Sequence, residues 1–146
     1  TLIRVRRTGE DHGFPYCVGS WADPQFNAGR NCSEFAQPAA LLGPHVAALG
    51  MRFYTGTMFP EQYRNQIFIA RRGSWNRARL SGYDVVVAHL DAQGNVTRLE
   101  EFMTGLRDDA NQRFLDRPAD VHVMRDGSLL VSGEQMGAIY RITYRR

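Results

Sequence analysis

The sequence predicts an all-β fold made of β-propeller blades, each an antiparallel four-stranded sheet, and two observations support this. A three-strand pattern occurs clearly at 119–144 and more loosely at 50–90. In the clear copy, short apolar runs are separated by an Asp126-Gly127 turn and a second glycine-containing turn. Antiparallel repeats about 54 to 62 residues apart are typical of propeller blades. Because a propeller ring needs about 4–8 blades, two blades predict only part of one.

Apolar runs and turn residues give the expected elements in chain order. A strand is expected at 1–7, followed by a long loop at 8–49. The later elements are a strand and turn at 50–56, a helical turn at 60–64 that begins with Pro60, strands at 67–70, 85–90 and 96–103, a loop at 104–118, and three strands within 119–144. The whole of 1–146 is thus expected to be one partial propeller domain, with about two blades, an open last blade and one long loop.

The composition narrows the function classes. The net charge is +3, and all 18 basic residues are arginine. These arginines are scattered along the chain, which argues against a nucleic-acid surface. No apolar run is long enough to predict a membrane span. The strand-like start at Thr1, without a methionine, predicts that the chain is a piece of a larger protein.

The two cysteines lie in the long loop. Cys17 and Cys32 bracket a segment with turn residues and little periodicity, which favours a disulfide that closes the loop at 8–49. Two free thiols are the alternative, and the chain has no accompanying histidine pair that would indicate zinc. A disulfide would place the protein in an oxidising compartment, periplasmic or secreted.

One loop gathers residues suited to a flat anion. Arg72, Trp75 and Arg77 follow the strand expected at 67–70. Arginine binds carboxylates through a planar fork, and tryptophan offers a stacking face. A solvated hairpin with Trp75 packed against the blade edge is the alternative interpretation.

Two further positions lie at expected strand starts. Pro118 restrains Arg117 to an extended conformation, and Asp116 precedes them. Either Arg117 binds a ligand, or Asp116 and Arg117 form a surface pair that braces a turn. His45 lies where the long loop meets a blade, as a ligand contact or a structural donor. The acidic run at 108–111 lacks the spacing of a calcium loop.

Five segments together resemble the glucose/sorbosone dehydrogenase family, in particular its L-sorbosone dehydrogenase-like members. They occur in one order, at 11–17, 45–54, 73–77, 117–121 and 137–142. The resemblance implies the C-terminal part of a six-bladed propeller that uses pyrroloquinoline quinone (PQQ) with Ca²⁺. It also implies oxidation of an aldose or aldehyde by hydride transfer to the quinone, with a separate redox electron acceptor.

The resemblance also suggests which residues contact PQQ. Arg117, His45 and Arg72 match or adjoin cofactor positions, and Trp75 and Arg77 complete the expected set. The family's catalytic histidine and calcium ligands belong to N-terminal blades upstream of this segment. No catalytic residue or metal ligand is therefore expected here, and the fragment alone is expected to be inactive. The alternatives are a non-catalytic fragment that binds a partner or polyanion, and a Ca²⁺-dependent lactonase-type propeller.

Overall fold

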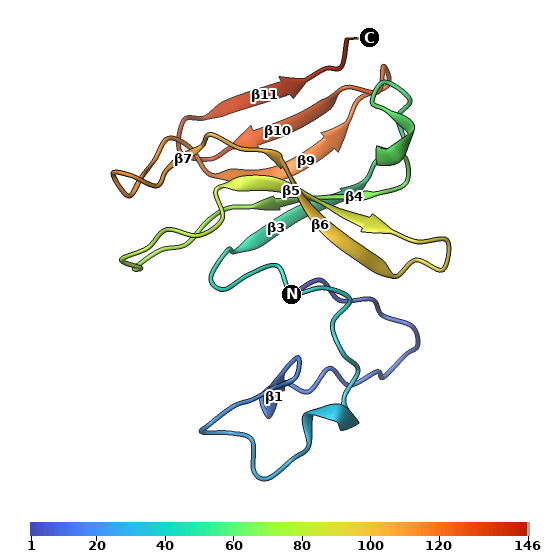
Figure 1. Ribbon diagram of the computed structural model, residues 1–146, viewed down its shortest axis with the longest axis vertical. Coiled ribbons are helices and arrows are strands. Elements are labelled where there is room, and N and C mark those ends of the chain that lie inside the picture. Colours follow the sequence, from blue (N-terminus) through green and yellow to red (C-terminus); the bar gives the residue numbers. More distant parts are fainter. Residues whose placement is uncertain (146) are drawn as a thin grey trace. The chain divides into compact units, whose positions relative to one another are not determined.

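Two antiparallel sheets form most of the regular structure in the computed structural model, which describes residues 1–145 (Figure 1). The first contains β3 (Ala48–Phe53), β4 (Ile67–Arg71), β5 (Asp84–Leu90) and β6 (Val96–Met103). Each strand pairs with its chain neighbour, so the sheet has the order β3-β4-β5-β6. The central strands β4 and β5 are buried along nearly their whole length, which explains their continuous apolar sequences.

The second large sheet has three strands. β9 (Pro118–Val123), β10 (Leu129–Gly133) and β11 (Ala138–Ile142) also pair in chain order. A short hairpin of β7 (Arg107–Asp108) and β8 (Arg113–Phe114) lies in the connection between the two sheets. The all-β, antiparallel class is therefore confirmed, while the strands of residues 1–145 do not close a ring of blades.

The two sheets share one hydrophobic core. It contains side chains from β4, β5, β9 and β10 together with two aromatic residues of the loop after β3: Tyr54, Phe59, Phe68, Ala70, Val85, Val87, Val121, Leu129 and Val131. The Tyr54 hydroxyl donates to the carbonyl of Gly127 (2.6 Å) and accepts from the backbone N–H of Phe59 (3.0 Å). This buried hydroxyl therefore ties the loop after β3 to the turn between β9 and β10.

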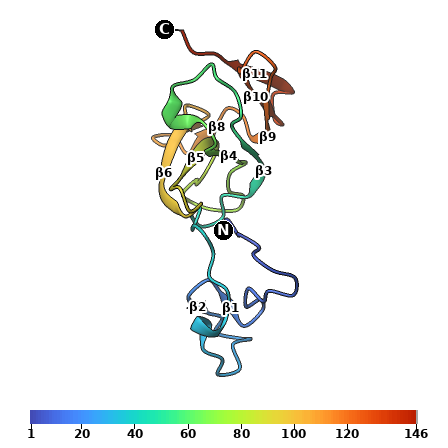
Figure 2. The same ribbon diagram turned by 90° about the vertical axis from the view of Figure 1, so that its right-hand side faces the viewer.

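The first strands of the two sheets also approach each other closely. A Cβ atom at Gly50 of β3 would lie 2.0 Å from Oδ1 of Asp120 on β9. Only glycine leaves room for that carboxylate, so Gly50 permits β3 and β9 to lie side by side. Figure 2 shows both strands from a second direction.

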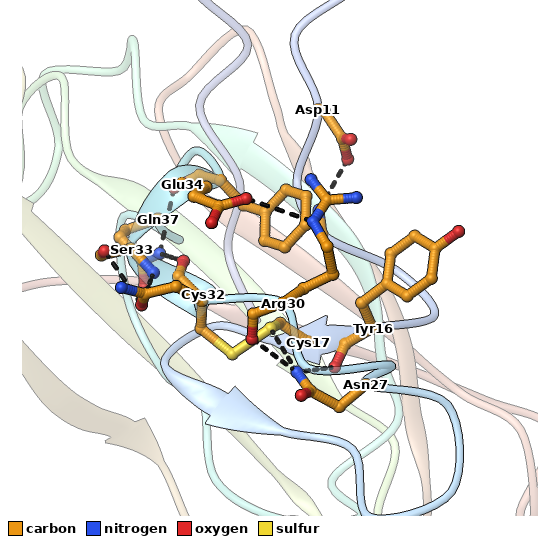
Figure 3. Close-up of a disulfide and its surroundings, with 12 residues drawn as sticks. Asp11, Tyr16, Cys17, Asn27, Arg30, Cys32, Ser33, Glu34 and Gln37 are labelled. Carbon is orange, nitrogen blue, oxygen red and sulfur yellow. Dashed lines mark hydrogen bonds and ion pairs between the residues drawn. A yellow bond between two sulfur atoms is a disulfide. The ribbon is translucent and has the colours of Figure 1, made fainter.

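Residues Thr1–Leu42 form a separate compact unit with little regular structure. It contains β1 (Cys17–Val18), β2 (Trp21–Ala22) and the 3₁₀ helix η1 (Cys32–Glu34). A disulfide joins Cys17 to Cys32, as the loop composition predicts. Beside it, the Asn27 side chain donates to the carbonyl oxygens of Tyr16 (3.2 Å) and Arg30 (2.9 Å) (Figure 3). The disulfide and Asn27 thus hold successive turns of this loop together.

The strand expected at 1–7 is wrong: only Leu2 pairs, in an isolated bridge with Ala40. Its neighbours Ile3 and Val5 are 46% and 72% exposed, so the alternating pattern buries no apolar face. The helical turn after Pro60 is present as η2 (Glu61–Tyr63). The loop expected at 104–118 instead contains the β7–β8 hairpin.

Candidate functional site

The candidate site lies at one end of the strands of the two large sheets, where β4 and β10 end and β3, β5 and β9 begin. Four loop segments meet there, at 43–47, 72–83, 115–117 and 134–137. They carry all five residues that the sequence analysis selected as cofactor contacts: His45, Arg72, Trp75, Arg77 and Arg117. The fold thus brings residues up to 72 positions apart in the sequence (117 − 45) to this end of the strands.

A buried ion pair holds the base of the 72–83 loop. The guanidinium of Arg71, at the end of β4, pairs with the carboxylate of Asp84, at the start of β5 (Nε–Oδ1, 2.7 Å). Farther along the loop, Gly73 has a φ of +103°, and a Cβ there would lie 2.6 Å from the Tyr83 ring. Glycine is therefore required for both the backbone conformation and the close packing of Tyr83.

Arg117 lies over an aromatic pair. The rings of Tyr83 and Phe114 stack with centroids 5.0 Å apart, and the Arg117 guanidinium carbon lies 4.4 Å from the Phe114 centroid and 5.1 Å from that of Tyr83. Its Nη2 donates to the carbonyl of Ser74 (3.2 Å). Its Nη1 is buried and has no hydrogen-bond partner within residues 1–145. A buried, unsatisfied guanidinium nitrogen is unfavourable, and a ligand carboxylate would satisfy it.

Arg72 forms an ion pair with a carboxylate of the protein itself, that of Glu134. Its guanidinium forms a two-point ion pair with Glu134, in which Nη2 donates to Oε1 (2.8 Å) and Nε donates to Oε2. The guanidinium holds the pKa of Glu134 below its ordinary value, and the carboxylate raises the pKa of Arg72. This pair joins the loop after β4 to the turn after β10, so one fork of Arg72 is already occupied.

The remaining three predicted contacts are exposed to solvent. The side chain of Trp75 is 75% exposed, so the alternative in which Trp75 packs against the sheet edge is wrong. Arg77 lies two residues further along the same exposed loop. His45 has a φ of +57°, in the left-handed region that few non-glycine residues adopt. None of these three side chains makes a hydrogen bond or ion pair within the described part of the chain, so all three remain open to a ligand.

Asp116, which the sequence suggested only as half of a surface pair, is the central acidic residue among these loops. Asp116 is completely buried and does not form the surface pair considered as an alternative. Its Oδ1 accepts from the backbone N–H groups of Arg117 (2.8 Å), Gln135 (2.9 Å) and Met136 (3.1 Å), and its Oδ2 accepts from the Tyr140 hydroxyl (2.7 Å). Its position immediately before Arg117-Pro118 was the only local signal.

The charge state of Asp116 follows from these contacts. Burial by itself would raise the pKa of Asp116, because burial disfavours the charged form. The hydrogen bonds from Tyr140 and the three backbone N–H groups outweigh burial and hold the pKa below its ordinary value. Asp116 is therefore an ionised carboxylate at neutral pH.

The site residues fit PQQ better than they fit calcium. PQQ is a flat tricarboxylate, which suits the unpaired Nη1 of Arg117 and the exposed ring of Trp75. Within residues 1–145, no group of three or more His, Cys, Asp or Glu side chains could hold a metal ion. Oδ1 of Asp108, in the acidic run, already accepts from the N–H groups of Ala110 and Asn111. The described side chains therefore do not form a calcium site.

Comparisons with known proteins point to one family. A family model described as TrAA12-like matches residues 25–145. An uncharacterized protein of Borreliella burgdorferi is 34% identical over 140 residues, which cover 94% of this chain and 37% of that protein.

None of the helices in residues 1–145 has the length and apolarity needed to cross a bilayer.

Two kinds of solved structure are similar. The holo form of the pyranose dehydrogenase PQQ domain from Coprinopsis cinerea has a TM-score of 0.61 and 28% identity, over 77% of this chain and 30% of that one. Family AA12 structures from Trichoderma reesei, one with iodide and one with calcium, have a TM-score of 0.70 at 19% identity. They cover 90% of this chain and 38% of theirs, which shows a shared fold. The chain thus spans about a third of the length of the proteins that it matches.

These findings correct the family expected from the sequence. The resemblance to glucose/sorbosone dehydrogenases is wrong, because the family model that matches 25–145 is TrAA12-like. The five segments that suggested the resemblance are short, and three of them lie mostly within the strands β3, β9 and β11.

Proposed function

The chain belongs to the TrAA12-like family, and from this premise we propose that it forms part of a PQQ-dependent dehydrogenase that oxidises a sugar. The similar domain from Coprinopsis cinerea is described as the PQQ domain of a pyranose dehydrogenase, which favours an aldose in its pyranose form as the substrate. Because this chain spans about a third of its relatives, the activity proposed is that of the whole protein.

The observation that carries this proposal is the Nη1 nitrogen of Arg117, which has no hydrogen-bond partner within residues 1–145. Nη2 is held by the Ser74 carbonyl and the guanidinium is stacked on Phe114, so its plane is fixed. Nη1 remains buried without a partner. A fixed guanidinium with unused N–H groups is well suited to bind a carboxylate of a rigid planar cofactor.

Each of the other predicted residues has a distinct role in the proposal. Bound PQQ would supply the chemistry by accepting a hydride from the sugar. Trp75 would offer an aromatic face for stacking, and Arg77 would attract the carboxylates from the same loop. Arg72, held by Glu134, would contact the cofactor through the N–H groups that Glu134 leaves free, and His45 would contact it from the loop before β3.

We also propose that the two large sheets are neighbouring blades of a propeller. Both are antiparallel sheets ordered as in the sequence, and their first strands β3 and β9 lie side by side. These features are typical of blades that share an inner wall. A structure of the full-length protein tests this proposal, and a closed sandwich of only these two sheets would contradict it.

The disulfide supports a location outside the cytoplasm. A disulfide persists in the periplasm or after secretion, and the chain has one between Cys17 and Cys32. We therefore propose that the protein acts as a periplasmic or secreted enzyme and transfers its electrons to a separate redox acceptor. Fractionation of the producing cells tests this, and recovery in the cytoplasm alone would contradict it.

Titration of the full-length protein with PQQ, in the presence of Ca²⁺, tests the function. We expect the quinone absorbance to shift on binding, and Arg117→Ala to weaken binding by about tenfold or more, as expected for loss of a charge-assisted hydrogen bond. Arg125→Ala is the matched control. Arg125 is exposed in the β9–β10 turn, which lies at the other end of the strands of the same sheet.

The alternatives predict different results. A non-catalytic protein that binds a partner or polyanion would give no quinone signal. A lactonase-type protein would be active without PQQ. Equal binding by wild type and Arg117→Ala would refute the assigned site.

A further inference from the structure

Asp116 links two of the three arginines of the candidate site, Arg72 and Arg117, to one turn. Its Oδ1 holds the backbone N–H of Arg117 and those of Gln135 and Met136. The carbonyl of Arg117 in turn accepts from the backbone N–H of Glu134 (2.9 Å). Residues 116–117 and 134–136 are therefore joined by three hydrogen bonds, in which Asp116 and Arg117 provide the acceptors.

These hydrogen bonds hold both Arg117 and Arg72 in place. Arg117 is attached to it directly through its own main chain. Arg72 comes from the other sheet and is attached through the ion pair of its guanidinium with Glu134. The packing at this point is tight, because a Cβ at Gly133 would lie 1.8 Å from Oδ2 of Asp116. Neither the carboxylate nor the turn can shift without changing the other.

We propose that Asp116 is a positioning residue that fixes Arg117 directly, and Arg72 through Glu134, in the geometry that binds a carboxylated ligand. This inference rests on the proposed function for the identity of that ligand. Asp116 is buried among main-chain donors and the Tyr140 hydroxyl, so it acts through other residues and does not touch the ligand. A buried carboxylate held by four donors gives a rigid support, which preorganised sites require.

Three variants separate positioning from simple stabilisation. Asp116→Ala removes all four contacts, and we expect PQQ affinity to fall by about ten- to a hundredfold, the range typical of supporting residues. Asp116→Asn keeps an oxygen acceptor for the three N–H groups and should restore affinity to within about threefold of wild type. Tyr140→Phe removes only the Oδ2 contact and should have the smallest effect.

Asp126→Asn is the matched control. Asp126 lies in the turn between β9 and β10, at the other end of these strands from the candidate site. Its carboxylate also accepts a backbone N–H, that of Ser128 (2.9 Å). We expect this variant to lower the melting temperature without changing PQQ affinity. If Asp116→Ala lowers the melting temperature but leaves affinity unchanged, Asp116 is only structural and the inference is wrong.

A second measurement does not depend on PQQ. In wild type, NMR should show the Nε–H of Arg72 protected from solvent exchange by Glu134. Asp116→Ala should remove this protection, whereas Asp126→Asn should keep it. Unchanged protection in Asp116→Ala would overturn the inference even if PQQ does not bind. Conversely, loss of protection with no PQQ binding in wild type would refute the proposed function alone.

Discussion

The two units of the chain, Thr1–Leu42 and Gly43–Arg146, are each stabilised internally in a different way. In the first, the buried cluster consists of Cys17, Cys32 and Phe35, and a disulfide joins two of these three residues. In the second, nine buried side chains from the two sheets and the loop after β3 form one core. A short segment that cannot bury enough apolar surface depends on a covalent link, whereas paired sheets are stabilised by packing.

The same contrast places the candidate site. All the predicted cofactor contacts lie in the second unit, on loops whose ends are fixed by strands of the two sheets. The first unit exposes several large apolar side chains, including Trp21 and Phe26, on short or irregular segments. Sites that need fixed side chains are more precise on rigid elements, which is what the second unit provides.

Phe68→Ala should have the largest effect on stability. Phe68 is completely buried in the core of the second unit, where its ring packs edge-on against Phe102 (4.7 Å between centroids). We expect a loss of about 3–5 kcal/mol in the free energy of unfolding, measured by urea denaturation. Phe26→Ala, at an exposed site of the first unit, should change it by no more than about 0.5 kcal/mol. Similar losses for both would remove the contrast between the units.

Cys17→Ala with Cys32→Ala should have the next largest effect, confined to the first unit. Opening the loop between these cysteines, which are 15 residues apart, should cost about 3 kcal/mol. Limited proteolysis should then cut faster within 18–31. Hydrogen exchange in β4 and β5 should stay slow, and loss of their protection would show that the second unit also depends on the disulfide.

Tyr54→Phe tests how much a polar contact inside the apolar core contributes to the stability of the second unit. The change keeps the ring but leaves the Gly127 carbonyl and the Phe59 N–H without their partner. We expect a loss of about 1–3 kcal/mol, because buried unsatisfied groups are destabilising. Equilibrium denaturation measures this, and an unchanged midpoint would mean that water replaces the hydroxyl.

Asp126→Asn should give the smallest effect, and one that depends on pH. Hydrogen bonds from the side chain and backbone of Ser128, together with Arg141, lower the pKa of Asp126 to about 2. The ionised form therefore stabilises the fold above the ordinary pKa near 4, and this contribution is lost as the pH falls toward 2. The difference in melting temperature between wild type and variant should shrink between pH 5 and pH 2, and a constant difference would contradict this assignment.

Much of the second unit could be predicted from the sequence. β6 has the expected bounds, 96–103, and the strands expected at 67–70 and 85–90 begin or end within one residue of β4 and β5. These strands carry apolar runs bounded by turn residues, a signal that is local in the sequence. The strand expected at 1–7 did not form, because Ile3 and Val5 face solvent and only Leu2 is buried.

The sequence alone determined the antiparallel β class, the paired cysteines and the loops that carry His45, Arg72, Trp75, Arg77 and Arg117, because each depends on local residue types and spacing. Only the tertiary structure decided that Asp116 is buried, that Arg72 pairs with Glu134 and that Nη1 of Arg117 is buried without a partner. These features join residues 62 positions apart or depend on burial between sheets, and no local pattern encodes either.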